Sequence, residues 1–137
     1  MNTPYKSPFS NISVLKPKMQ YSACVFSMPH SGREYFPSFI NSSRLNFNTL
    51  RSSEDFFLDQ FFDIASEYGS SVIKANFPRA FLDLNREPFE LDPDMFIDKL
   101  PEFINSRSKK VALGLGTIPR VVSNSREIYK NKLKWED

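Results

Sequence analysis

Histidine, cysteine and glycine are scarce in this 137-residue sequence, and each shortage narrows what the chain can be. There is one histidine, one cysteine and four glycines. The cysteine, Cys24, has no disulfide partner within the chain, and its place in a short apolar run predicts an inert, buried thiol. No segment approaches the roughly 18 apolar residues that span a bilayer, and no apolar segment precedes a signal-type cleavage site. We therefore expect a cytoplasmic protein without a membrane partner.

Neither sign of charge is in clear excess, because 18 lysines and arginines face 16 acidic residues. A nucleic-acid binder would show a basic surplus or a basic stripe, so we expect no nucleic-acid partner. Phenylalanine, by contrast, is abundant, with 14 copies. That number predicts a compact core and also surface that a partner covers. The length suits one domain but is short for a complete α/β enzyme.

Two strands separated by a helix form the clearest predicted unit. Residues 22–28 and 71–75 are short apolar runs, typical of buried strands. Residues 53–68 place apolar side chains at helical spacing behind a natural N-cap, Ser53. The order strand, helix, strand predicts parallel pairing of the two strands. The phenylalanines expected to form the helix's buried stripe are Phe57, Phe61 and Phe62.

The other predicted elements are shorter. Residues 1–21 are rich in Asn, Ser, Pro and Lys, and this composition predicts an irregular lead-in to one domain over residues 22–137. The remaining expectations are a helical turn over 37–45, strands over 80–84 and 111–115, and helices over 94–104 and 126–135.

The single histidine, His30, lies in the motif Pro29-His30-Ser31-Gly32, directly after the first predicted strand. A side chain at that position comes out at the carboxyl edge of a sheet, where open α/β folds build their sites. A loop histidine bonded to the backbone is the alternative interpretation. The acidic pair Glu54-Asp55 likewise has two interpretations, since acidic residues at a helix start are favoured by the helix dipole alone.

Three arginines are candidates for binding an anionic substrate: Arg79, Arg86 and Arg120. A guanidinium offers a planar fork that matches a carboxylate with two hydrogen bonds. The alternative is that each arginine pairs with a neighbouring acid, such as Asp83, Glu87 or Glu90. The loop from Gly114 to Arg120 lacks the additional glycine of a dinucleotide-binding fingerprint and the Lys-Ser/Thr of a P-loop. We interpret it as a tight turn that lets the backbone approach the site and presents Arg120.

These motifs, in this order and within the same strand–helix pattern, resemble the N-formylglutamate amidohydrolase (deformylase) family. The resemblance runs from about residue 24 to residue 129. The matching segments are Pro29-His30-Ser31-Gly32, Arg51-Ser52-Ser53-Glu54-Asp55 followed by Asp59, Arg79 with Asp83-Leu84-Asn85-Arg86, and Gly114-Leu115-Gly116-Thr117-Ile118-Pro119-Arg120.

The resemblance implies a phosphorylase/hydrolase-like α/β fold, a three-layer sandwich related to the zinc carboxypeptidases. It also implies a zinc-dependent hydrolase that removes the formyl group from N-formylglutamate or a similar small N-acyl acidic amino acid. His30 would be a zinc ligand, and one acid of the pair Glu54 and Asp55 would be the second, with Asp55 favoured. The other residues that the resemblance assigns are Arg79, Asn85 and Arg86, which would bind substrate, and Arg120, which would be catalytic.

One departure from the family concerns the rest of the site. Members continue beyond the glycine loop into a second half with a further ligand histidine, and this sequence has no second histidine. We therefore expect the N-terminal portion of the fold only, inactive alone. The alternative to the enzyme is a non-catalytic fragment or split-gene product, whose partner would be a separate C-terminal half or a second copy. A third interpretation is a stand-alone binding module for small carboxylates.

Overall fold

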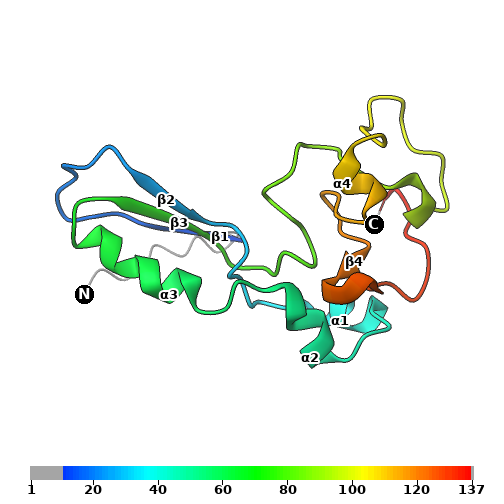
Figure 1. Cartoon of the computed structure of the whole chain (residues 1–137), viewed down its shortest axis with the longest axis horizontal. Helices are drawn as coiled ribbons and strands as arrows, with labels where there is room; N and C mark the ends of the chain where they lie inside the picture. Colours follow the sequence, from blue (N-terminus) through cyan, green and yellow to red (C-terminus); the bar gives the residue numbers. More distant parts are fainter. Residues whose placement is uncertain (1–10, 137) are drawn as a thin grey trace. The chain divides into compact units, whose positions relative to one another are not determined.

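The computed structural model describes residues 11–136, which divide into two compact units. The first unit consists of residues 11–34 and 54–78, and the second of residues 35–53 and 79–136. Both units are built from short helices, short strands and long irregular connections (Figure 1). The chain is therefore a mixed α/β protein with small sheets, in agreement with the predicted class.

The first unit contains a three-stranded sheet in the order β1-β3-β2. Its strands are β1 (Ile12–Leu15), β2 (Val25–Met28) and β3 (Ser71–Ala75). The central strand β3 pairs in parallel with β2 and antiparallel with β1. The β-branched residues Val72 and Ile73 favour this pleated conformation. The two predicted strands, β2 and β3, and their parallel pairing are confirmed.

One face of this sheet is covered by the helix α3 (Leu58–Phe62) and the 3-10 turn η2 (Asp63–Ser66) (Figure 1). Ala65 packs with the buried Met28 and Val72. The rings of Phe26 and Phe62 lie 5.2 Å apart between the strand and the helix. This packing fixes the segment that follows Glu54-Asp55 against the strand that leads to His30.

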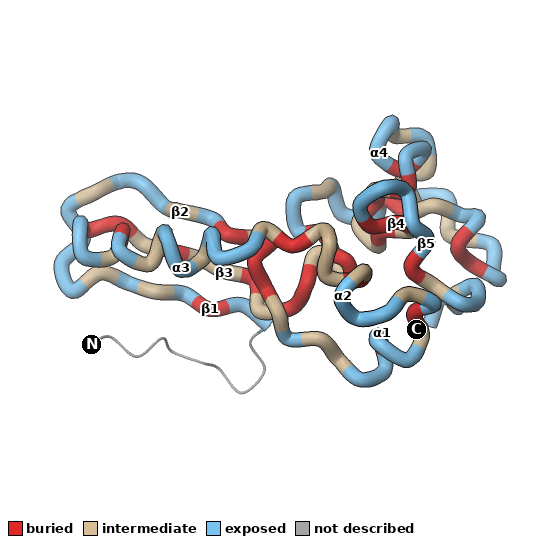
Figure 2. Tube along the Cα trace, turned by 60° about the horizontal axis from the view of Figure 1, so that its bottom comes forward, coloured by how far each residue is buried: buried red, intermediate tan, exposed pale blue. Residues whose placement is uncertain are grey.

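The helix predicted over residues 53–68 is wrong in its first part. α3 begins only at Leu58, because Phe57 adopts a left-handed conformation with φ 62° that a continuing helix cannot contain. The predicted buried stripe is wrong as well. Phe57 and Phe61 are 54% and 76% exposed, while Phe62 packs against the core. Figure 2 shows no buried residue along α3.

Two expectations near the chain's beginning also differ from the structure. The strand β1 lies inside residues 1–21, which were expected to be irregular, and its first and last residues pair with Ala75 and Val72. Residues 1–10 of that stretch lie outside the described part. Cys24 is exposed rather than buried, and it lies one residue before β2, whose first residue Val25 is exposed as well. The inert core thiol predicted for Cys24 is therefore wrong.

The second unit has eight short elements in its described part. Its helices are α1 (Pro37–Ser42), α2 (Phe47–Leu50) and α4 (Lys109–Ala112), its 3-10 turns are η1 (Arg51–Ser53), η3 (Pro93–Met95) and η4 (Ser123–Ser125), and its paired strands are β4 (Val121–Val122) and β5 (Arg126–Glu127). One apolar cluster forms around Leu50 and Ile128, and another around Met95 and Phe96. Tyr129 packs against both clusters.

Several predicted elements of this unit do not form. The strand expected over 111–115 is replaced by α4, whose N-cap Ser108 accepts a hydrogen bond from the Val111 amide at 3.1 Å. The helix expected over 126–135 is replaced by β5 and by extended chain, because Tyr129 pairs with Ser43 in an isolated bridge. No regular strand forms over the expected residues 80–84. Of the helix expected over 94–104, only the residues that belong to η3 are helical. The helical turn expected over 37–45 is confirmed by α1. Among the described helices, none has the length and apolar character needed to cross a bilayer.

Candidate active site

His30 lies in a buried loop that directly follows β2. The loop passes very close to the chain that leaves β3. A Cβ atom added to Gly32 would overlap the carbonyl oxygen of Phe77 and lie 2.6 Å from the carbonyl carbon of Asn76. The Glu34 amide donates to the Asn76 carbonyl at 2.8 Å. The motif Pro29-His30-Ser31-Gly32 therefore contains glycine because a side chain would separate the two strand ends.

The same loop is bonded to the segment that carries the predicted acidic ligands. The Asp55 amide donates to the His30 carbonyl at 3.0 Å, and the Ser31 hydroxyl donates to the Asp55 carbonyl at 2.9 Å. These two bonds bring the His30 Nδ1 atom within 3.4 Å of an Asp55 carboxylate oxygen. The imidazole is 9% exposed and the Asp55 side chain 42% exposed. The pair is thus reachable by solvent from the aspartate side.

Glu54, the other predicted acid, is 8% exposed. Neither Glu54 nor Asp55 lies in the first turn of a helix, because α3 starts beyond them and its first-turn acid is Asp59. The helix-dipole explanation of this acidic pair is therefore wrong. The pair lies in a bend whose backbone is held by the His30 loop.

These donors can be compared with what a zinc site requires. Two ligands of one tetrahedral zinc ion, each about 2.0–2.1 Å from the metal, lie about 3.3 Å apart. The separation of 3.4 Å between His30 Nδ1 and Asp55 Oδ2 agrees with that spacing. Within residues 11–136, no group of three or more His, Cys, Asp or Glu side chains could hold a metal. The described residues therefore fit two corners of a zinc site.

The second unit contains the predicted substrate-binding residues, and a buried carboxylate joins two of them. Asp83 is 2% exposed. Its Oδ2 atom lies 2.8 Å from Arg79 Nη2 and 3.3 Å from Arg86 Nη2. Its Oδ1 atom accepts the Asn85 amide at 2.9 Å. The interpretation that Arg79 and Arg86 pair with a neighbouring acid is correct for Asp83, and the same pairing brings both guanidinium groups to one point.

The glycine loop lies directly against this cluster. The Asp83 amide donates to the Thr117 carbonyl at 2.8 Å, and Arg86 Nε donates to the Leu115 carbonyl at 2.6 Å. The Thr117 amide donates to the Glu90 carbonyl at 2.7 Å. A Cβ atom on Gly116 would overlap that same carbonyl oxygen. The predicted role of this loop, a tight turn that allows close backbone approach, is confirmed.

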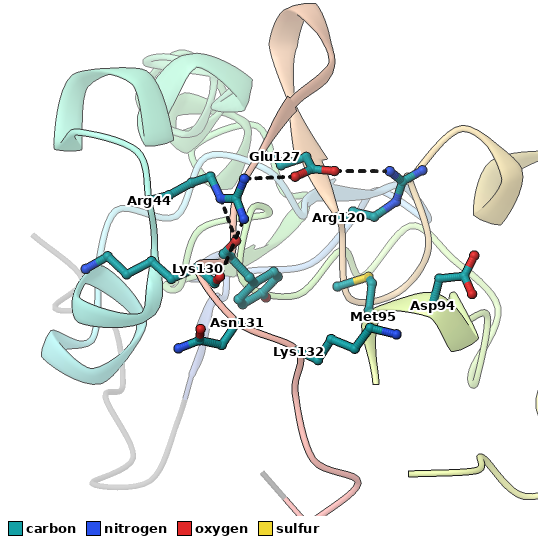
Figure 3. A pocket seen from close by; sticks show the side chains of 9 residues that line it. Arg44, Asp94, Met95, Arg120, Glu127, Lys130, Asn131 and Lys132 are labelled. Carbon is teal, nitrogen blue, oxygen red and sulfur yellow. Dashed lines mark hydrogen bonds and ion pairs between the residues drawn. The ribbon is translucent and has the colours of Figure 1, made fainter. Parts of the chain in front are cut away.

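Arg120 has a different environment from Arg79 and Arg86. Its Nε atom lies 2.9 Å from Asp92 and its Nη1 atom 3.7 Å from Glu127. It lines an open pocket of about 180 Å³, which Figure 3 shows with Arg44 and Arg120 on either side of Glu127. Arg44 Nη1 lies 3.1 Å from Glu127, and its Nε donates to the Tyr129 carbonyl at 2.8 Å. The other residues of this pocket are Asp94, Met95, Lys130, Asn131 and Lys132.

The predicted residues therefore fall into two groups. His30, Glu54 and Asp55 belong to the first unit, and Arg79, Asn85, Arg86 and Arg120 to the second. Sequence reasoning treated Asp83 only as a partner that would neutralise an arginine, and it did not consider Arg44. Asp83 had a signal in the motif Asp83-Leu84-Asn85-Arg86, whereas Arg44 stands in no motif and has no signal in the sequence.

Comparison with known proteins agrees with this arrangement of motifs. The family model of N-formylglutamate amidohydrolase matches residues 22–137. A search of the curated proteins finds no match. Among solved structures, the N-formylglutamate amidohydrolase of Ralstonia eutropha JMP134 is similar, with a TM-score of 0.81 and 27% sequence identity. The similarity covers 91% of this chain and 44% of that one, so this chain spans less than half of the relative's length. The chain belongs to the N-formylglutamate amidohydrolase family.

Proposed function

We propose that this chain provides metal-binding and substrate-binding residues for hydrolysis of an N-formylated acidic amino acid, with N-formylglutamate as the substrate. The observation that carries the proposal is the proximity of His30 Nδ1 and Asp55 Oδ2, in a chain of this family. We also propose that the small sheet with α3 on one face belongs to a three-layer sandwich of the zinc carboxypeptidase type.

In this proposal, His30 and Asp55 are zinc ligands, and Glu54 is the alternative second ligand. When bound, zinc would lower the pKa of a coordinated water and polarise the formyl carbonyl. Ser31 and Gly32 act indirectly, since the Ser31 hydroxyl and the close approach at Gly32 hold the imidazole loop in place. A third protein ligand would have to come from outside the described residues.

The substrate's carboxylates are bound by arginine in this proposal. Arg79 and Arg86 share one buried acid, so the pair retains one net positive charge. A guanidinium binds a carboxylate through two parallel N–H donors. Asn85, whose side chain is exposed, adds an amide donor beside Arg86. Arg120 is the proposed catalytic arginine, and its ion-pair partners Asp92 and Glu127 hold its guanidinium in one orientation.

The experiment is zinc binding and formate release by the purified chain. We expect zinc affinity to fall by at least about tenfold in His30→Ala and in Asp55→Asn, since loss of an orienting partner alone costs that much. The matched control is Asp63→Asn, which removes the same charge from an exposed aspartate that pairs with Lys74 at 2.7 Å. Unchanged zinc affinity in His30→Ala would refute the ligand assignment.

A second candidate function is carboxylate binding without catalysis. The observation that favours it is the pair of guanidinium groups of Arg79 and Arg86, which needs no metal to bind a carboxylate. The two candidates separate in one assay. Zinc-dependent formate release from N-formyl-L-glutamate, and not from N-formyl-L-leucine, supports the enzyme. Thermal stabilisation by N-formyl-L-glutamate without formate release supports the non-catalytic binding chain.

A further inference from the structure

Asp83 is the carboxylate that joins Arg79 to Arg86, and its side chain is more buried than either of theirs. Its side chain is 3% exposed, against 24% for Arg79 and 10% for Arg86. An ionised carboxylate is costly to bury unless charged or polar partners compensate it. Here two guanidinium groups and one backbone amide provide that compensation. Because the acid is below the surface, it cannot itself be the group that contacts a substrate carboxylate.

Asp83 is fixed from both sides. Its own amide is bonded to Thr117 of the glycine loop, and its Oδ1 atom is bonded to the Asn85 amide. The Oδ2 atom contacts the two arginines. Arg86 is held further by the Leu115 carbonyl, which accepts from Nε at 2.6 Å. The glycine loop and the Asp83–Arg86 turn therefore set the position of a single oxygen atom to which both guanidinium groups are directed.

The charges give this oxygen a role beyond neutralisation. One arginine would suffice to compensate one carboxylate, whereas two like-charged guanidinium groups repel each other. Without Asp83, that repulsion favours separation of Arg79 and Arg86. With Asp83, both remain within 3.3 Å of one atom and carry a net positive charge. Two convergent cationic forks are suited to a ligand with two carboxylates.

We infer that Asp83 is a positioning residue, which acts through Arg79 and Arg86 to hold a binding site for dicarboxylates. The inference rests on the proposed function for its substrate class, N-acyl acidic amino acids. Asp83 itself makes no contact with the ligand. Its contribution depends entirely on the two arginines, and this dependence separates a positioning role from a general effect on stability.

The test is calorimetric binding of two probes, glutarate and N-formyl-L-glutamate, to the full chain. Asp83→Asn keeps the shape of the side chain but removes its charge, and we expect a loss of affinity of at least tenfold for the probes that the wild type binds. In a chain that already carries Arg79→Gln and Arg86→Gln, the same change should alter affinity by less than twofold. A purely structural role would weaken both backgrounds equally. Asp63→Asn, the matched control, should bind as the wild type does.

Asp83→Asn leaves two partly buried guanidinium groups without their anion and could prevent folding. Asp83→Asn combined with Arg86→Gln restores the charge balance, and it should bind more weakly than Arg86→Gln alone because Arg79 has lost its anchor. The inference is overturned if Asp83→Asn binds the probes as the wild type does, or if Asp83→Asn combined with Arg86→Gln binds them as Arg86→Gln alone does. Either result leaves the proposed substrate intact. Binding of glutarate that requires Asp83, without binding of N-formyl-L-glutamate, supports the inference and refutes the substrate. A wild-type chain that binds neither probe refutes both.

Discussion

Replacing Gly32 with alanine should destabilise the first unit more than any other single-methyl addition at its glycines. The added Cβ would overlap the Phe77 carbonyl oxygen and lie 2.6–2.7 Å from two Asn76 backbone atoms. All three atoms are backbone, so no side-chain rotation can relieve the overlap. The His30 loop must instead move away from the end of β3.

The size of the effect follows from what that movement disrupts. Overpacking of a close contact costs about 1–3 kcal/mol. Separation of the two segments also strains the bond from Glu34 to Asn76, which contributes about 0.5–1.5 kcal/mol. We therefore expect a loss of about 1.5–4.5 kcal/mol in the free energy of unfolding. For 137 residues the unfolding entropy is about 290 cal/mol/K, so Tm should fall by about 5–16 °C.

The assay is thermal and urea unfolding of Gly32→Ala beside Gly69→Ala. Gly69 has φ 76°, and the atoms nearest its added Cβ belong to the exposed ring of Tyr21, a side chain that can move aside. Its substitution should therefore cost only the left-handed backbone penalty, about 1–2 kcal/mol. The reasoning is refuted if the free energy of unfolding of Gly32→Ala lies within about 1 kcal/mol of the wild-type value, or above that of Gly69→Ala. Glycine at position 32 would then not be required by the close approach of the two segments.

Two further predictions concern the core of the second unit. Burial raises the pKa of Tyr129 above the ordinary 10.0, so its native state keeps a proton that the unfolded state releases. The contribution of Tyr129 to stability is complete below pH 10 and is lost as the pH rises further. In urea titrations between pH 9 and 11, Tyr129→Phe should therefore lose less stability than the wild type. Tyr68→Phe, at an exposed position, should follow the wild type, and identical curves for all three proteins would contradict the prediction. The second prediction concerns Leu50, which is fully buried: Leu50→Ala should lower the free energy of unfolding by about 2–5 kcal/mol. Leu113 is 64% exposed, so Leu113→Ala should change it by about 0.5 kcal/mol or less. Equal losses would be inconsistent with the packing of this core.

The fold could be predicted from the sequence where the chemistry is local. β2 and β3 carry β-branched and apolar residues in short runs, and α1 begins with a proline at its first turn. Prediction failed where distant segments decide the conformation. The chain after Glu127 has the apolar spacing of a helix, but its backbone pairs with Ser43 and Phe96 in isolated bridges. No property of residues 126–135 alone indicates those partners.

One missed element did have a local signal. Ser108 precedes Lys109–Ala112 as an N-cap, and Gly114 follows with φ 73°, a frequent conformation after the end of a helix. Residues 111–115 were instead predicted to be a strand that enters the glycine loop. Over so few residues, an apolar run distinguishes a strand from a helical turn poorly.

The candidate site, like the fold, has features that the sequence indicates and features that it does not. The motif residues His30, Asp55, Arg79 and Arg86 could be named from the sequence, and so could Asp83 as an acid that pairs with the arginines. The contacts that hold His30 beside Asp55 could not. The His30–Asp55 contact depends on a hydroxyl bond from Ser31 and on the break in the helix at Phe57. The arginine pair depends on one oxygen of Asp83. The bonds between the His30 loop and Asp55 join segments far apart in the sequence and involve backbone groups, to which residue type is a weak guide. Asp83, by contrast, lies within four residues of both arginines.

The two glycine-containing motifs nevertheless share one physical device. In each, a missing Cβ lets the loop backbone touch a carbonyl of a distant segment, Phe77 for Gly32 and Glu90 for Gly116. In each, a residue next to the glycine then bonds the loop to the segment that carries the second functional group: Ser31 to Asp55, and Thr117 to Asp83. Side-chain packing alone would leave such loops adjustable by small shifts, whereas backbone contact with hydrogen bonds on both sides fixes them. The scarcity of glycine in this chain is therefore informative, because two of its four glycines are used where backbone must meet backbone beside the candidate site residues.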